Sequence, residues 1–108
     1  MNLIALFFAG AFICNCIPHL ACGLQGAPFP TPFASPRGIG HSSPLVNFLW
    51  GFGNFLAGAF LLSRHRIAFE FDPSLTTLSL MAPYVGALAM GAYLSLHFGK
   101  VQHEQKDE

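Results

Sequence analysis

This sequence of 108 residues contains only five basic residues (Lys and Arg) and five acidic ones (Asp and Glu), and their positions leave three long runs uncharged. The runs cover residues 1–36, 38–63 and 73–99. The charged fraction is 9%, against roughly 25% in an average soluble domain, and so small a chain has too much surface to leave it uncharged. The sequence therefore predicts an all-α membrane protein, a single membrane domain over residues 1–108, with three transmembrane helices.

The first apolar segment has two interpretations, a secretory signal or a membrane helix. No Lys or Arg precedes it, and no clean small-x-small cleavage pattern follows it. The apolar run also continues through Pro18 to Leu24, roughly the 20 residues that a spanning helix needs. We therefore expect a retained first helix over about residues 2–24.

A capping residue followed by proline marks the start of each of the other two helices. Ser43 is an expected N-cap with Pro44 at the first helical position, and Asp72 and Pro73 repeat the pattern. These signals predict helices over about residues 44–63 and 73–99, followed by a polar tail over residues 100–108.

The two connections differ in composition. The first, QGAPFPTPFASPRGIGHSSP, is too rich in Pro and Gly for a regular element, and its PFPTPF segment is expected to be extended. Phe29 and Phe33 are expected at the membrane interface or folded back over the helix ends. The second, RIAFEFDP at residues 66–73, alternates apolar and polar side chains, which predicts a short extended segment on the interface.

The orientation in the membrane is left open by the basic residues. Arg64 and Arg66 at the end of the second helix favour a cytoplasmic location for that side. Arg37 and Lys100, on the opposite side, nearly balance them.

Polar side chains within the first two helices form a predicted seam. Asn15 and His19 lie four residues apart and share one helix face, as do Asn47 and Asn54, seven apart. Because the helices run antiparallel, Asn15 and Asn54 are expected at one depth in the membrane, near its middle. His19 and Asn47 are expected at another depth, nearer the connection. A bare amide in hydrocarbon costs several kcal/mol, so we expect these side chains to face one another.

A second pattern predicts helix packing on the third helix. Small residues recur at every fourth position and form a ridge that allows close approach of another helix, within the chain or between copies. The ridge consists of Ala87, Gly91, Ser95 and Gly99.

The segment CNCIPHLAC raises the alternative of a metal or haem site. Cys16, His19 and Cys22 carry ligand atoms that suit zinc, copper or iron, and His41 or His97 would have to complete the set. The three cysteines are an odd number, which excludes a fully paired intrachain disulfide framework. We expect no cofactor and interpret His19 as a hydrogen-bonded structural residue.

NCIPHLACGLQGAPFPTPFASP, followed by SSPLVNFLWG, resembles a family of small uncharacterised bacterial integral-membrane proteins. In that family an Asn-x-x-Pro-His segment leads into a Pro-Phe-rich connection and a Leu-Val-Asn helix. The resemblance covers about the first half of the chain and implies a bacterial inner membrane location without a known activity. It is carried by Asn15, Pro18, His19, Gly23, Gly26, Pro28, Phe29, Pro32, Phe33, Ser43, Pro44, Val46 and Asn47.

The sequence has no arrangement typical of catalysis: no Ser/His/Asp set, paired carboxylates or phosphate-binding glycine loop stands out. Its formal net charge is zero, so nucleic acid is not expected as a partner. The expected function is non-enzymatic, as a structural or accessory membrane subunit. The alternative is a protomer of an oligomeric channel or transporter that uses the seam. The expected partners are the lipid bilayer and either a second copy or a larger membrane complex.

Overall fold

The computed structural model describes residues 3–71 and 76–106 of the chain. Its helices are α1 (Leu3–Leu24), α2 (Pro44–Phe71) and α3 (Thr76–Lys106). Two short strands, β1 (Phe29–Pro30) and β2 (His41–Ser42), lie in the connection between α1 and α2. All three helices are long and apolar enough to cross a membrane. The predicted fold class, an all-α membrane protein with three transmembrane helices, is therefore confirmed.

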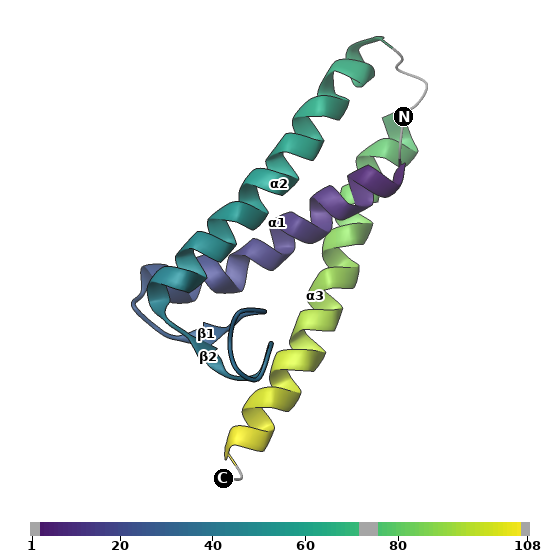
Figure 1. Cartoon of the computed structure of the whole chain (residues 1–108). Helices are drawn as coiled ribbons and strands as arrows, with labels where there is room; N and C mark the ends of the chain where they lie inside the picture. Colours follow the sequence, from purple (N-terminus) through teal and green to yellow (C-terminus); the bar gives the residue numbers. More distant parts are fainter. Residues whose placement is uncertain (1–2, 72–75, 107–108) are drawn as a thin grey trace.

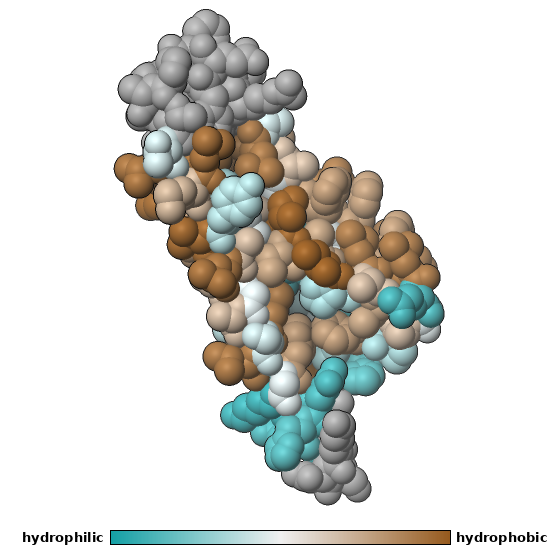
Figure 2. All heavy atoms as spheres, turned by 180° about the vertical axis from the view of Figure 1, so that it is seen from behind, coloured by the Kyte–Doolittle hydropathy of each residue, from teal (hydrophilic) through white to brown (hydrophobic). Residues whose placement is uncertain are grey.

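Helix α1 lies between the other two helices (Figure 1). It packs along both α2 and α3, whereas α2 and α3 barely touch each other. The molecule measures 55 × 24 × 20 Å, so its long axis exceeds the ~30 Å hydrocarbon thickness of a bilayer. Figure 2 shows hydrophobic side chains over most of the rear face and hydrophilic ones gathered toward the C-terminal end. This apolar exterior is the surface that an integral membrane protein presents to lipid.

Glycines set the close approach of α1 and α2. A Cβ atom at Gly51 would lie 2.9 Å from the Leu20 backbone nitrogen, and one at Gly58 would lie 2.9 Å from the Ala9 carbonyl oxygen. Real Cβ atoms essentially never come so near, so only glycine permits this spacing. Association of helices in lipid depends on such contacts because apolar burial gives no driving force there.

The crossing of α1 and α3 uses a reciprocal pair of glycines. A Cβ atom at Gly10 would overlap the carbonyl oxygen of Pro83, and one at Gly86 would overlap the carbonyl oxygen of Phe7. Both obstacles are backbone atoms, which cannot move aside as a flexible side chain can. The two helices therefore touch backbone to backbone at this crossing.

The end of α1 turns the chain into the connection. The Ala27 amide donates to the Cys22 carbonyl at 2.8 Å, and the Gly26 amide donates to the Gly23 carbonyl at 3.2 Å. Gly26 adopts a φ of 72°, the left-handed conformation that this type of helix end requires and that glycine adopts without steric cost. The start of α2 is capped as predicted, since the Val46 amide donates to Oγ of Ser43 at 3.2 Å.

The connection contains a small element that the sequence did not predict. Strands β1 and β2 pair antiparallel, with Phe29 opposite Ser42 and Pro30 opposite His41. The two ends of the connection are brought together because α1 and α2 are antiparallel neighbours, and the pairing satisfies backbone groups that would otherwise lack partners.

Two predicted boundaries are wrong. The extended segment expected at residues 66–73 is helical as far as Phe71, because α2 continues through it. A short strand without a partner leaves its backbone groups unpaired, whereas a continued helix pairs them internally. Similarly, the predicted tail after Gly99 is helical to Lys106, and KVQHEQK contains no Gly or Pro to end the helix. The expected cap at Asp72 and Pro73 lies outside the described residues.

Candidate functional site

His19 and Asn47 form the pair of the seam that lies nearer the connection. The His19 side chain is 2% exposed and the Asn47 side chain is fully buried. Nδ2 of Asn47 donates to the carbonyl oxygens of Phe29 (2.9 Å), Ser42 (3.2 Å) and Ser43 (3.1 Å). Its Oδ1 is therefore the acceptor that faces Nδ1 of His19, at 2.8 Å. One amide thus joins α1, β1 and the start of α2.

Asn15 and Asn54 form the deeper pair. Nδ2 of Asn15 donates to Oδ1 of Asn54 at 3.0 Å. Nδ2 of Asn54 in turn donates to the backbone carbonyl of Trp50 at 2.8 Å, one helical turn earlier on α2. The amide of α1 is therefore linked through a second amide to the backbone of α2.

Both predicted contacts of the seam are confirmed, Asn15 with Asn54 and His19 with Asn47. Among the described residues, no buried side-chain nitrogen or oxygen lacks a hydrogen-bond partner. Each seam side chain makes at least one bond within the chain, which is the arrangement expected for polar groups in hydrocarbon. The seam's role as a functional site stays a prediction.

The third helix contributes a residue that sequence reasoning did not place with the seam. Nε2 of His97 donates to the Gly38 carbonyl at 2.7 Å, because a carbonyl can only accept. Gly38 has a φ of 68°, a conformation that favours glycine, and it presents this carbonyl toward α3. The signal that could have identified it is a lone histidine near the end of an apolar helix, at the depth of a glycine-rich connection.

Aromatic rings surround the pair formed by His19 and Asn47. Phe29 folds back over the helix ends, with ring centroids 4.6 Å from Phe98 and 5.6 Å from His19. Phe33 is 69% exposed and its ring lies edge-on to Trp50 at 5.2 Å. Phe29 is therefore folded back over the helix ends as expected, whereas Phe33 lies at the surface of the molecule, and its position at the membrane interface stays a prediction.

A cavity of about 150 Å³ lies beside the seam. Its walls come from all three helices and from the connection, so the connection forms one side of this cavity as well as joining two helices. Its lining includes Asn15, His19, Trp50, Leu94 and His97.

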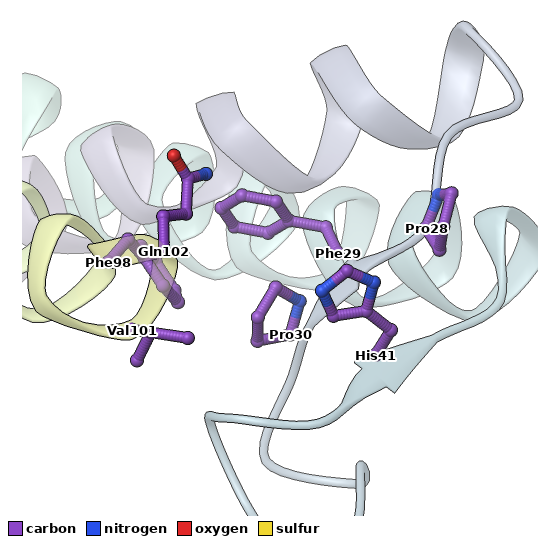
Figure 3. Close-up of a pocket in the computed structure, with 7 residues that line it drawn as sticks. All are labelled: Pro28, Phe29, Pro30, His41, Phe98, Val101 and Gln102. Atoms are coloured by element: carbon purple, nitrogen blue, oxygen red, sulfur yellow. The ribbon is translucent and has the colours of Figure 1, made fainter. Parts of the chain in front are cut away.

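A second hollow, of about 300 Å³, lies between the connection and the C-terminal part of α3 (Figure 3). Phe29 and Pro30 of β1 face Phe98 and Val101 of α3 across it. Its polar groups are His41 and Gln102, both exposed. This hollow is mainly apolar and proline-lined, and it adjoins the seam cavity through Pro30 and Phe98, which line both.

The residues considered for a metal site do not assemble into one. Sγ of Cys16 donates to the carbonyl of Ile13 at 2.9 Å within α1, and Cys14, Cys16 and Cys22 are all free thiols. No group of three or more His, Cys, Asp or Glu side chains suited to a metal ion occurs in the described parts of the chain. His19 instead takes the structural hydrogen bond to Asn47.

The predicted small-residue ridge on α3 is divided in two. A Cβ atom at Gly91 would meet Sγ of Cys14 at 3.5 Å, an ordinary contact, so this part of the ridge faces α1. Ser95 and Gly99 are exposed, and a Cβ atom at Gly99 would meet nothing within 4 Å. The closest backbone contacts of α3 with α1 lie outside the ridge, at Pro83 and Gly86.

No protein-family model, curated protein or solved structure matches this chain.

Proposed function

We propose that this integral membrane protein is a structural or accessory subunit of a larger membrane assembly, located in the bacterial inner membrane. The location rests on the resemblance of the first half of the chain to small bacterial membrane proteins. The accessory role rests on one observation, the extent of the polar seam across the membrane.

The seam ends at the level of Asn15 and Asn54. Beyond that level, α1 has only apolar residues from Leu3 to Ile13, and α2 has only apolar residues from Phe55 to Leu62. A pathway for a polar solute needs polar groups or water across the whole hydrocarbon region. The seam of a single chain reaches only part of that distance, and its bonds join the helices to each other.

A partner surface is available on α3. Between Leu78 and Leu96 its outward face is mainly apolar, with Leu88 and Leu96 exposed by 75% and 76%. Its candidate span, Thr77–Glu104, is 28 residues long, about 42 Å at 1.5 Å per residue, which is longer than the hydrocarbon thickness. A larger membrane subunit packed against this face would cover the surface that α2 leaves open.

Reciprocal purification from native membranes tests the accessory role. The tagged chain is expected to bring down one membrane protein in constant ratio, and that protein, when tagged, is expected to recover this chain. Leu88→Lys should abolish the association, whereas Leu45→Lys, at an exposed position on α2, should leave it intact if both variants insert. Recovery of the chain alone from mild detergent would contradict the proposal.

The alternative is a protomer of an oligomeric channel or transporter that uses the Asn15/His19/Asn47/Asn54 seam. The exposure of Ser95 and Gly99 favours it, because the outer part of the ridge is free to pack against a second copy. Purified chain in liposomes would then self-associate and release a trapped solute, and Gly99→Leu would reduce both effects. An accessory subunit should leave the liposomes sealed.

A further inference from the structure

The cavity beside the seam has a polar wall and an aromatic wall. Asn15 and His19 contribute from α1, and His97 contributes from α3. Trp50 lines it from α2, and Thr31 lines it from the connection. Binding sites for small molecules commonly combine apolar walls with a few placed polar groups that converge from different elements.

The polar wall has hydrogen-bonding capacity beyond the bonds already described. Because Nδ1 of His19 donates to Asn47, the neutral imidazole keeps a lone pair on Nε2. Because Nε2 of His97 donates to Gly38, the lone pair of that ring is on Nδ1. The bond to Asn54 uses one N–H of Asn15, so the second N–H of Asn15 and its Oδ1 can bond a ligand.

The charge of the lining selects against ions. Among the described residues that line the cavity there is no Asp, Glu, Lys or Arg. An ionised ligand would lose its hydration without gaining a counter-charge, which is costly in a membrane-embedded site. An uncharged ligand that both donates and accepts hydrogen bonds fits the lone pairs of the histidines and the amide of Asn15.

The volume limits the size of the ligand. A cavity of about 150 Å³ is comparable to an engineered cavity that accepts benzene, so it holds a molecule of about six non-hydrogen atoms. We propose that the cavity between α1, α2, α3 and the connection is a binding site for a small uncharged molecule of the amide or alcohol class. The polar end of the ligand meets Asn15 and His19, and its apolar end meets Trp50.

This inference concerns the isolated chain, so it does not depend on the proposed accessory role. Trp50 is the only tryptophan of the sequence and lines the cavity, so its fluorescence reports occupancy directly. Acrylamide is a neutral primary amide of suitable size that quenches tryptophan. In the purified full-length protein we expect a saturable static component, seen as intensity loss without a shorter lifetime, in the millimolar range typical of such small ligands.

Two leucines of α3 provide a matched pair of variants. Leu94 lines the cavity, whereas Leu96 is exposed on the outer face of the same helix. Leu94→Phe should weaken the saturable component by about tenfold or more, because the larger ring occupies the ligand's volume. Leu96→Phe should leave it unchanged. Acetamide, which does not quench, should compete with acrylamide in the unmodified protein and restore the intensity.

The competition experiment keeps the test decisive if Leu94→Phe does not fold. Quenching that is wholly collisional in the unmodified protein would overturn the proposal. So would a saturable component that acetamide does not relieve, because that component would reflect partition into detergent. A folded Leu94→Phe variant that binds acrylamide as before, or an equal loss in both variants, would overturn it as well.

Discussion

Asn47 on α2 accepts a 2.8 Å hydrogen bond from His19 on α1 while its own amide nitrogen donates to three backbone carbonyls at the base of the connection. The three carbonyls determine which end of the amide is the nitrogen, since a reversed amide would place its oxygen against three other oxygens. A single side chain therefore sets the tautomer of His19 and the position of the connection together.

Replacing Asn47 by leucine should destabilise the protein by at least about 2 kcal/mol, because it leaves buried donors and acceptors unpaired at about 1–3 kcal/mol each. Unfolding titrations in mixed detergent micelles measure the change. Ser95→Ala is the control, since Oγ of Ser95 bonds only carbonyls of its own helix. Equal stability of both variants would show that the Asn47 bonds contribute nothing net.

The deeper pair of the seam is suited to a double-mutant cycle. Asn15→Leu and Asn54→Leu should each be destabilising, and their combination should be less so than the sum, with a coupling of about 0.6 to 2 kcal/mol. The coupling arises because the 3.0 Å bond between the two amides is lost only once. Strict additivity in the same micelle titration would mean that the amides do not interact in solution.

The crossing of α1 and α3 predicts opposite effects at two glycines of one helix. Gly86→Ala should destabilise by about 1–3 kcal/mol, because the new methyl group meets the Phe7 carbonyl and forces the helices apart. Gly99→Ala should be neutral or stabilising by up to about 1 kcal/mol, because the space around it is open and alanine favours the helix. If Gly86→Ala had a higher melting temperature than Gly99→Ala, α1 and α3 would not cross at Gly86.

The bond from His97 to Gly38 should act mainly on the connection. His97→Phe keeps a ring to stack on Tyr93 but removes the donor, so a loss of about 0.5–1.5 kcal/mol is expected. Hydrogen exchange should then become faster at the Gly38 and Gly40 amides, which close the turn by bonding Thr31 and Pro36.

Tyr93→Phe is the matched control for that experiment, since it keeps the stacked ring and removes only a hydroxyl from a side chain that is 62% exposed. Exchange at Gly38 that is equally fast in both variants would assign the effect to ring packing.

The seam could be predicted from the sequence because the signals that indicate it are local and periodic. The spacing of Asn15 and His19 on one helix, and of Asn47 and Asn54 on the next, fixes two faces, and the antiparallel order of the helices fixes their depths. Sequence reasoning did not predict the hydrogen bond of His97 to Gly38 or the strand pairing, since both depend on how the connection folds back over the helix ends. It did not single out Pro83 and Gly86 as the contact of α3 with α1, because several small positions of one helix satisfy the same pattern.

By itself, the sequence determined that this chain spans the membrane three times and that its few buried amides meet between the first two helices. Long uncharged runs have no stable alternative to helices in lipid, and an unpaired amide there is too costly to tolerate. Only the tertiary structure decided that α1 is the central helix, that Gly10 and Gly86 form its crossing with α3, and that the connection closes a cavity over the seam. These features depend on distances between backbones, which periodicity within one helix does not contain.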